Sequence, residues 1–212
     1  MKLKFVKGLT CLMLASAFLS GCGQSGELDT TSIYIRKDGS VSSAVYEAFD
    51  TKNYSQEELQ EFVEDNVSAY NQSEAGVAAA YTKDTEEALS VAVKSLEVED
   101  NEAVLKMEYA SCEDYLQFNE SEGSILQLAS GTVAGAEKAG IDLGQFELLN
   151  PEGSEKISGS DVDEKYYVIF VEGTTTIQVE GSIQYATADV KVEDKDTAQV
   201  SSADSLSCII FK

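Results

Sequence analysis

The C-terminal half of the chain alternates apolar and polar residues with a period of two, and this pattern restricts the possible folds more than any other feature. Residues 166–171 form a continuous apolar run, which is typical of a strand buried on both faces. Every second side chain of a strand lies on the same face. We therefore expect this half to consist mainly of β-strands. The alternating apolar positions are Ile177, Val179, Ile183, Tyr185, Val190, Val192, Leu206, Cys208 and Ile210.

The N-terminal half contains two further hairpin signals. Alternating runs flank the dipeptide Asp38-Gly39, which favours a type I′ turn and predicts a first hairpin over residues 33–45. A second alternation covers residues 89–109, with a phase slip near Lys94 and Ser95 that suggests a β-bulge. Its two runs are separated by residues 99–102, where we expect the second turn.

Helical spacing follows the first hairpin. Ser55 with Glu58 three residues later is a capping box, which marks the start of an amphipathic helix. Ser111 is suited to cap a short helix over residues 112–118. Residues 125–129 read either as a short strand or as the start of a helix, and we favour a strand followed by a helix over residues 132–139. The apolar positions of the first helix are Leu59, Phe62, Val63, Val67 and Tyr70.

These elements predict an α+β fold with a mostly antiparallel sheet, a few helices grouped on one face and a β-rich C-terminal half. The chain has 212 residues, of which 43% are hydrophobic and 25% are charged. This composition is that of a globular protein with its own core. We expect one domain over residues 31–212.

The charge and the missing residue types exclude several classes of function. The formal net charge is -23, and Arg36 is the single arginine of the sequence. Binding to nucleic acid requires clustered Lys and Arg, so we expect no nucleic-acid partner. The sequence contains no His, which excludes Ser-His-Asp and Cys-His catalysis and the commonest zinc ligand. We expect neither a resident metal nor a cofactor.

The N-terminus reads as a secretory signal over residues 1–21. Three lysines within the first seven residues precede an apolar stretch over residues 9–19 that is short for a membrane span. The stretch ends in Leu19-Ser20-Gly21-Cys22. An ordinary signal peptide with an incidental Cys, or an uncleaved membrane anchor, is the alternative reading.

The tetrapeptide Leu19-Ser20-Gly21-Cys22 resembles the lipobox of bacterial lipoprotein precursors. In that family a diacylglycerol is attached to the Cys thiol, the signal is cleaved before it, and further acylation, such as with palmitate, can follow. The resemblance implies that Cys22 anchors the protein at the cell membrane and that the domain faces the extracytoplasmic side. Residues 22–30 would then be the lipidated Cys and a flexible spacer.

The rest of the chain resembles uncharacterised small lipoproteins of low-GC Gram-positive gut bacteria. This likeness lies in the order of three segments, which are residues 131–140, residues 179–185 and the terminal residues 209–212. It implies a cell-envelope compartment and carries no known site.

Cys112 and Cys208 are the two cysteines that remain after lipidation and signal removal. Outside the cytoplasm they are candidates for a disulfide, and both positions also fit buried apolar packing. A catalytic thiol at Cys112 lacks a His to act as its base. We therefore nominate no catalytic residue.

Acidic clusters supply weak candidates for calcium. Asp161 and Asp163 lie in one cluster, and Asp194 and Asp196 in another. Both clusters flank predicted strands and fit solvated turns, and neither has the Gly and closing Glu of an EF-hand. A structural metal is therefore not part of the main interpretation.

Two functions remain open. The first is a lipid-anchored extracytoplasmic binding or interaction module of the cell envelope, whose partners are the membrane, through Cys22, and an unknown envelope protein, glycan or peptide. The second is a carboxylate-dependent hydrolase of cell-wall or dietary polymers, which requires two suitably spaced carboxyl groups. A cleft lined by two facing carboxyl groups would favour the hydrolase.

Overall fold

The computed structural model describes residues 28–73, 76, 89–120 and 124–212. The α+β class, the mostly antiparallel sheet and the β-rich C-terminal half are confirmed. The described elements in chain order are β1 (Ser32–Ile35), β2 (Val41–Ala48), α1 (Gln56–Asn71), β3 (Val91–Glu99), β4 (Glu102–Tyr109), α3 (Cys112–Phe118), β5 (Ile125–Thr132), α4 (Val133–Lys138), η1 (Leu143–Gln145), β6 (Glu147–Leu149), β7 (Lys156–Ser158), η2 (Gly159–Asp161), β8 (Tyr167–Val179), β9 (Ile183–Ala186), β10 (Val190–Val192) and β11 (Thr197–Phe211).

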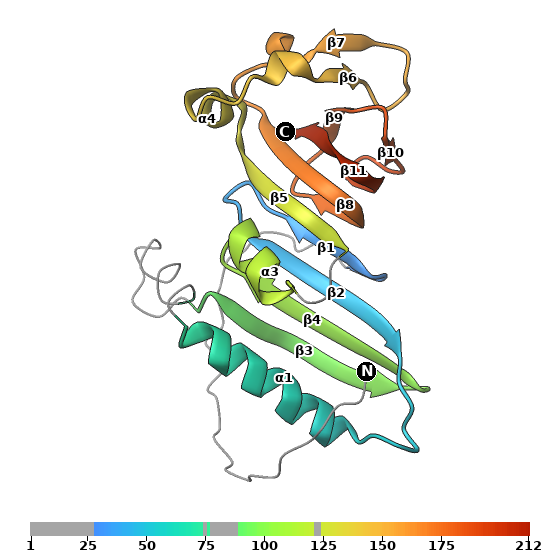
Figure 1. The fold of residues 1–212 in the computed structure, drawn as a ribbon. Helices are drawn as coiled ribbons and strands as arrows, with labels where there is room; N and C mark the ends of the chain where they lie inside the picture. Colours follow the sequence, from blue (N-terminus) through green and yellow to red (C-terminus); the bar gives the residue numbers. More distant parts are fainter. Residues whose placement is uncertain (1–27, 74–75, 77–88, 121–123) are drawn as a thin grey trace.

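One sheet contains all the described strands. Its order is β3-β4-β2-β1-β8-β11-β9-β6-β7, with β5 beside β8 and β10 beside β11. Among the described pairs, β1 and β8 are parallel and the others are antiparallel. Figure 1 shows the sheet running from β3, beside α1, to β6 and β7 at the other end of the molecule.

The long antiparallel pair of β8 and β11 connects two hydrophobic clusters. Ile169 and Val171 of β8 belong to the larger cluster, whereas Val168 and Phe170 belong to a second one. Successive strand residues point to opposite faces, so the two clusters lie on opposite sides of β8. All four side chains are buried, which confirms the prediction of a strand covered on both faces.

The helices cover these clusters. α1 contributes the buried Val63 and α3 the buried Cys112 to the larger cluster, so both helices lie on the same face of the sheet. α4 contributes Val133 and Ala136 to the second cluster, on the other side of β8. The expected grouping of helices on one face therefore holds for α1 and α3 and does not extend to α4. Within the described residues, no helix combines the length and the apolar character that a bilayer crossing requires.

Several local predictions are confirmed in detail. Ser55 caps α1, and its side chain and that of Glu58 form the reciprocal bonds of a capping box. The register of β3 and β4 shifts between Val93 and Ser95, where a bulge was expected. α4 is followed by Gly140 at φ +86°, a left-handed residue that ends the helix.

The type I′ turn occurs in the second hairpin and not in the first. A type I′ turn needs positive φ at both central residues. Asp100 and Asn101 have φ of 49° and 64°, and they are the described non-glycine residues with positive φ. At the first hairpin Gly39 alone is left-handed, and its N–H donates to the carbonyl of Arg36 at 3.0 Å. The first hairpin therefore has a longer loop than predicted.

The packed part of the chain begins before the predicted boundary. Leu28 is 8% exposed and packs with Tyr34, Ala44 and Tyr46 in a small cluster of its own. The Tyr46 hydroxyl donates a hydrogen bond of 2.9 Å to the carbonyl of Leu28. Leu28 lies within the expected spacer of residues 22–30, yet its side chain packs against the domain.

Candidate functional site

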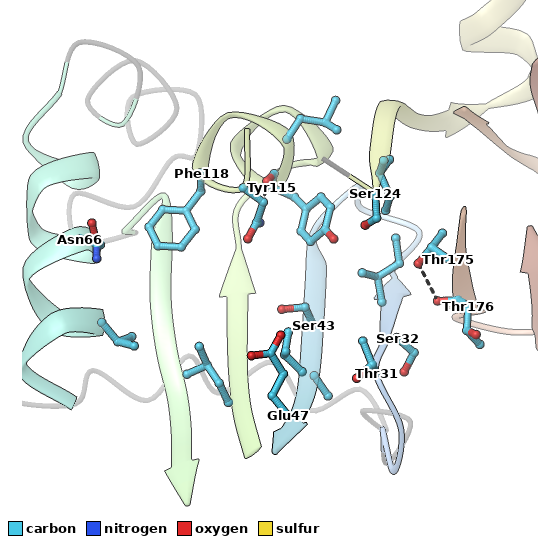
Figure 2. Close-up of a pocket in the computed structure, with 18 of the residues that line it drawn as sticks. Thr31, Ser32, Ser43, Glu47, Asn66, Tyr115, Phe118, Ser124, Thr175 and Thr176 are labelled. Carbon is cyan, nitrogen blue, oxygen red and sulfur yellow. Dashed lines mark hydrogen bonds between the residues drawn. The ribbon is translucent and has the colours of Figure 1, made fainter. Parts of the chain in front are cut away.

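A groove with a volume of about 880 Å³ lies between the two helices of the N-terminal half and the sheet (Figure 2). α1 forms one wall, α3 lies at one end, and the far side is formed by β8 and the start of β5. The volume falls within the range of small-molecule sites. This groove is the candidate functional site.

The floor is formed by residues of β1, β2 and β4. Ile33, Val45 and Leu105 supply apolar surface. Ser43 and Glu47 lie on the same face of β2, because positions 43, 45 and 47 follow the period of two. The floor is thus apolar with polar groups at intervals, which suits a ligand that has both kinds of surface.

The α1 wall carries an aromatic ring and an amide. Phe62 is 44% exposed, and Asn66 follows it one helical turn later. The Asn66 side-chain nitrogen donates a hydrogen bond of 2.7 Å to the Phe62 carbonyl. Figure 2 shows Asn66 on α1 at one side of the groove, opposite the strand that carries Thr175 and Thr176.

Aromatic side chains from α3 cover the end of the groove. Tyr115 and Phe118 extend from α3 toward the sheet (Figure 2). The Tyr115 ring packs edge-on against Tyr109 at 5.1 Å between centroids, and Phe118 packs edge-on against Tyr70 at 5.7 Å. Edge-to-face contacts of this kind stabilise aromatic pairs beyond the effect of burial. The end wall is therefore a packed aromatic cluster.

Hydrogen bonds fix α3 relative to α1. The Tyr70 hydroxyl of α1 donates to Asp114 Oδ1 of α3 at 3.1 Å. Asp114 is 2% exposed and also accepts a bond of 2.6 Å from the Ser111 hydroxyl. Burial raises the pKa of the Tyr70 phenol, and the neighbouring Asp114 carboxylate raises it further. The phenol therefore remains a hydrogen-bond donor at neutral pH.

Burial likewise keeps the other tyrosines of this wall neutral. It is the main cause of the raised pKa of Tyr115, and Tyr109 adds to the effect. Burial also raises the pKa of Tyr109, although its hydrogen bonds with Ser43 and Asn119 oppose this rise. These phenols act as hydrogen-bonding groups, and their pKa values do not suit a general base at neutral pH.

The far side of the groove lies at a break in the pairing of β8. β5 pairs with β8 as far as Gly173, and β1 pairs with β8 from Ile177 onward. The Thr174 N–H still donates to the Ser124 carbonyl at 2.9 Å, so the edge is without a strand partner at residues 175–176. All three residues, 174–176, line the groove. This opening adds threonine side chains and an interrupted strand edge to the site.

The groove is acidic in character. Among its described lining residues, Glu47 is the one with a formal charge, and none is Lys or Arg. The neighbouring α1 carries five acidic residues and no basic one. An anionic ligand would therefore be repelled by the groove and its surroundings. The acidic residues of α1 are Glu57, Glu58, Glu61, Glu64 and Asp65.

No family model, curated protein or solved structure matches this chain.

The predicted lipid attachment site lies outside the described residues. This holds for Cys22 and for the rest of the lipobox, Leu19, Ser20 and Gly21. The lipid anchor therefore remains a prediction from the sequence.

Cys112 and Cys208 are not brought together. Both thiols are free and buried, and they belong to the two different hydrophobic clusters. The Cys112 sulfur lies 3.3 Å from the Ser130 hydroxyl, within the cluster beneath α3. The candidate disulfide is therefore not formed, and the alternative of buried apolar packing is what the structure contains.

The acidic residues considered for calcium do not form a binding cage. Asp163 accepts a bond from the backbone N–H of Lys165, and Asp196 accepts one from the Thr197 hydroxyl. Asp161 ends η2, and Asp194 lies in the turn before β11. Across residues 28–212, as far as they are described, no group of three or more acidic, Cys or His side chains is placed to hold a metal ion.

In the sequence, the groove is marked by polar residues at positions on otherwise apolar strand and helix faces. Ser43 and Glu47 share a strand face with the buried Val41, and Asn66 falls within the apolar stripe of α1. Polar residues at such positions mark a face that is not fully covered by the core.

Proposed function

We propose that this protein is a lipid-anchored extracytoplasmic binding module of the bacterial cell envelope and that the groove is its ligand site. The anchor rests on Leu19-Ser20-Gly21-Cys22 and on the basic and apolar segments before it. The binding site rests on a groove of about 880 Å³ that combines apolar surface with hydroxyl and amide groups. The groove is the single observation that carries the function.

The lining indicates an uncharged or cationic ligand with an apolar part. Phe62, Phe118 and Leu105 provide surface for apolar groups, and cationic groups are attracted to aromatic faces. Glu47 provides a carboxylate for a positive group, and Asn66 provides an amide. A lysine-containing peptide and an uncharged glycan both have this chemistry, and the test below separates them.

The alternative hydrolase has less support. Hydrolysis by paired carboxyl groups requires an acid and a base or nucleophile on either side of the scissile bond. Glu47 is the single acidic side chain among the described residues that line the groove. Asp114 of α3 does not line the groove, and it is buried and bonded to Tyr70. This favours binding over hydrolysis.

A variant that fills the groove tests the proposal. Asn66→Trp places a large ring over the floor, whereas Asp65→Trp places the same ring at the adjacent exposed position that does not line the groove. Envelope extracts are passed over the immobilised chain of residues 22–212, and retained molecules are identified by mass spectrometry. We expect a ligand that the unmodified chain and Asp65→Trp retain and that Asn66→Trp loses.

Two outcomes oppose the proposal. Retention of the same molecules by all three proteins shows that the groove is not the site, and retention of nothing removes the binding function. A ligand that is cleaved on the column, with cleavage stopped by Glu47→Gln, supports the hydrolase instead. For a cationic ligand Glu47→Lys should reduce retention, whereas for an uncharged glycan it should not.

A further inference from the structure

Leu28 holds the N-terminal end of the described chain against the face of the sheet opposite the floor of the groove. Its side chain packs with Tyr34 and Ala44, and the Tyr46 hydroxyl bonds its carbonyl at 2.9 Å. In β2, positions 44 and 46 alternate with positions 43, 45 and 47, whose side chains face the groove. Successive strand side chains point to opposite faces, so Leu28 and the groove floor lie on opposite sides of the sheet.

The chain between Cys22 and this attachment is short. Five residues, 23–27, separate Cys22 from Leu28. Even a fully extended chain covers at most about 20 Å over this length. A lipid on Cys22 would therefore keep the membrane surface close to the face that holds Leu28.

The same face carries a cluster of cations. Arg36 and Lys94 both lie beside Glu108, at 3.7 Å and 3.5 Å. Lys106 lies directly opposite Ala44 in the β2–β4 register, so it also points to this face. Arg36 and Lys94 share the Glu108 carboxylate, and with Lys106 on the same face these four side chains carry a net positive charge. We call Arg36, Lys94, Lys106 and Glu108 the cation cluster.

The charge of the groove side is opposite. α1, which forms a wall of the groove, has five acidic residues and no basic residue. An anionic leaflet attracts Lys and Arg near its surface and repels carboxylates. This face also carries acids, Glu97 and Glu99 in β3 and Glu102 in β4. The charges of Glu180 and Asp196 act on Tyr34 of the Leu28 cluster. The attraction is therefore confined to the part of the face that holds the cation cluster.

We propose that the anchored protein turns the face with Leu28 and the cation cluster toward anionic lipid headgroups, so that the groove opens away from the membrane. This orientation rests on the lipid anchor of the proposed function. It results from two separate features, the short tether and the uneven charge. The groove would then be accessible to ligands from the extracytoplasmic side.

The experiment supplies the anchor chemically. The chain of residues 22–212 contains every described contact, and Cys22 is its one cysteine outside the buried Cys112 and Cys208. Cys22 is coupled to a maleimide-headgroup lipid in equimolar phosphatidylcholine–phosphatidylglycerol vesicles that contain a dansyl-headgroup lipid. The sequence has no Trp, so one introduced Trp reports its own distance from the dansyl groups by energy transfer.

Two variants report the two sides. Ser95→Trp places the probe opposite Lys106, beside the cation cluster, without removing a charge. Phe62→Trp places it on α1, at a position that is 44% exposed. We expect stronger energy transfer from Ser95→Trp than from Phe62→Trp. A long Gly/Ser insertion after Glu27 should bring the ratio of the two closer to one.

Equal transfer from the two variants, or stronger transfer from Phe62→Trp, overturns the proposal. If the long insertion leaves the ratio of energy transfer from the two variants unchanged, the short tether is not a cause of the orientation. Loss of the difference in vesicles of phosphatidylcholine alone assigns the orientation to charge, and its persistence there assigns it to the tether. The lipid is attached chemically, so the orientation is measured whether or not Cys22 is lipidated in the cell. Natural lipidation at Cys22 is tested separately.

Discussion

The hydroxyl of Tyr70 in α1 donates a hydrogen bond of 3.1 Å to the buried Oδ1 of Asp114 in α3. These residues are 44 positions apart in the sequence. The bond links the two helices that border the groove. The Ser111 hydroxyl satisfies the second carboxylate oxygen of Asp114, so the geometry of the groove depends on this small network.

Removal of this bond is expected to destabilise the protein. Tyr70→Phe leaves a buried carboxylate with one partner fewer, which should cost about 1–3 kcal/mol of unfolding free energy. Urea denaturation followed by circular dichroism measures the loss. Tyr54→Phe, at a position that is 50% exposed, is the matched control and should leave the midpoint unchanged. Equal midpoints for both variants would show that the bond contributes nothing.

Gly173 is expected to tolerate no side chain. Its φ is +139°, and a Cβ there would lie 2.7 Å from the Cα of Ile125 and still closer to the Ser124 carbonyl oxygen. Gly173→Ala should therefore cost about 2–4 kcal/mol. Gly131→Ala in β5 has nothing within 4 Å of the new Cβ and is the control. A Gly173→Ala protein as stable as the control would contradict the close approach of β5 and β8.

Alkaline pH is expected to weaken the fold. Burial raises the pKa of Tyr109 and Tyr115 above the ordinary value of 10.0. Above about pH 10 the unfolded chain loses these protons while the folded chain keeps them, so stability present below pH 10 falls as the pH rises. Denaturation midpoints measured on either side of pH 10 should show this decline, and Tyr115→Phe should reduce it. A decline of equal slope in Tyr115→Phe would contradict a contribution from this phenol.

The two buried thiols are expected to be unreactive in the folded protein. Burial raises the pKa of Cys112, and it raises that of Cys208 to about 12, so little thiolate is present at neutral pH. In the chain of residues 22–212, a maleimide should label Cys22 alone until denaturant is added. The intact mass should also be the same with and without a reductant. Rapid labelling of Cys112, or a mass lower by two hydrogens, would contradict this environment.

Lipidation at Cys22 is tested in the native host or a related bacterium. Cys22→Ala should prevent modification and either release the protein from the membrane fraction or leave an unprocessed precursor. Mass spectrometry and membrane fractionation report the change. Cys112→Ala, which removes a buried thiol of the domain, should keep the lipid and the membrane location. Unchanged mass and fractionation of Cys22→Ala would remove the anchor from the proposed function.

Local patterns predicted most of the elements because their signals are short in range. The capping box of Ser55 and Glu58 depends on residues three positions apart, and the alternation in β8 depends on the nearest neighbours. The turn type at Asp38-Gly39 was wrong because the register of the whole hairpin selects the loop length. Residues 100–101 took up the type I′ conformation although they lack Gly.

The sequence by itself determined the strand-rich α+β architecture, the acidic character and the candidate lipid anchor, since each depends on composition or on nearby residues. The tertiary structure alone decided where polar residues such as Ser43, Glu47 and Asn66 come together, and that Cys112 and Cys208 stay apart. The physical reason is that the groove is formed where α1, α3 and the sheet do not fill the space between them. That outcome depends on long-range packing such as the bond between Tyr70 and Asp114.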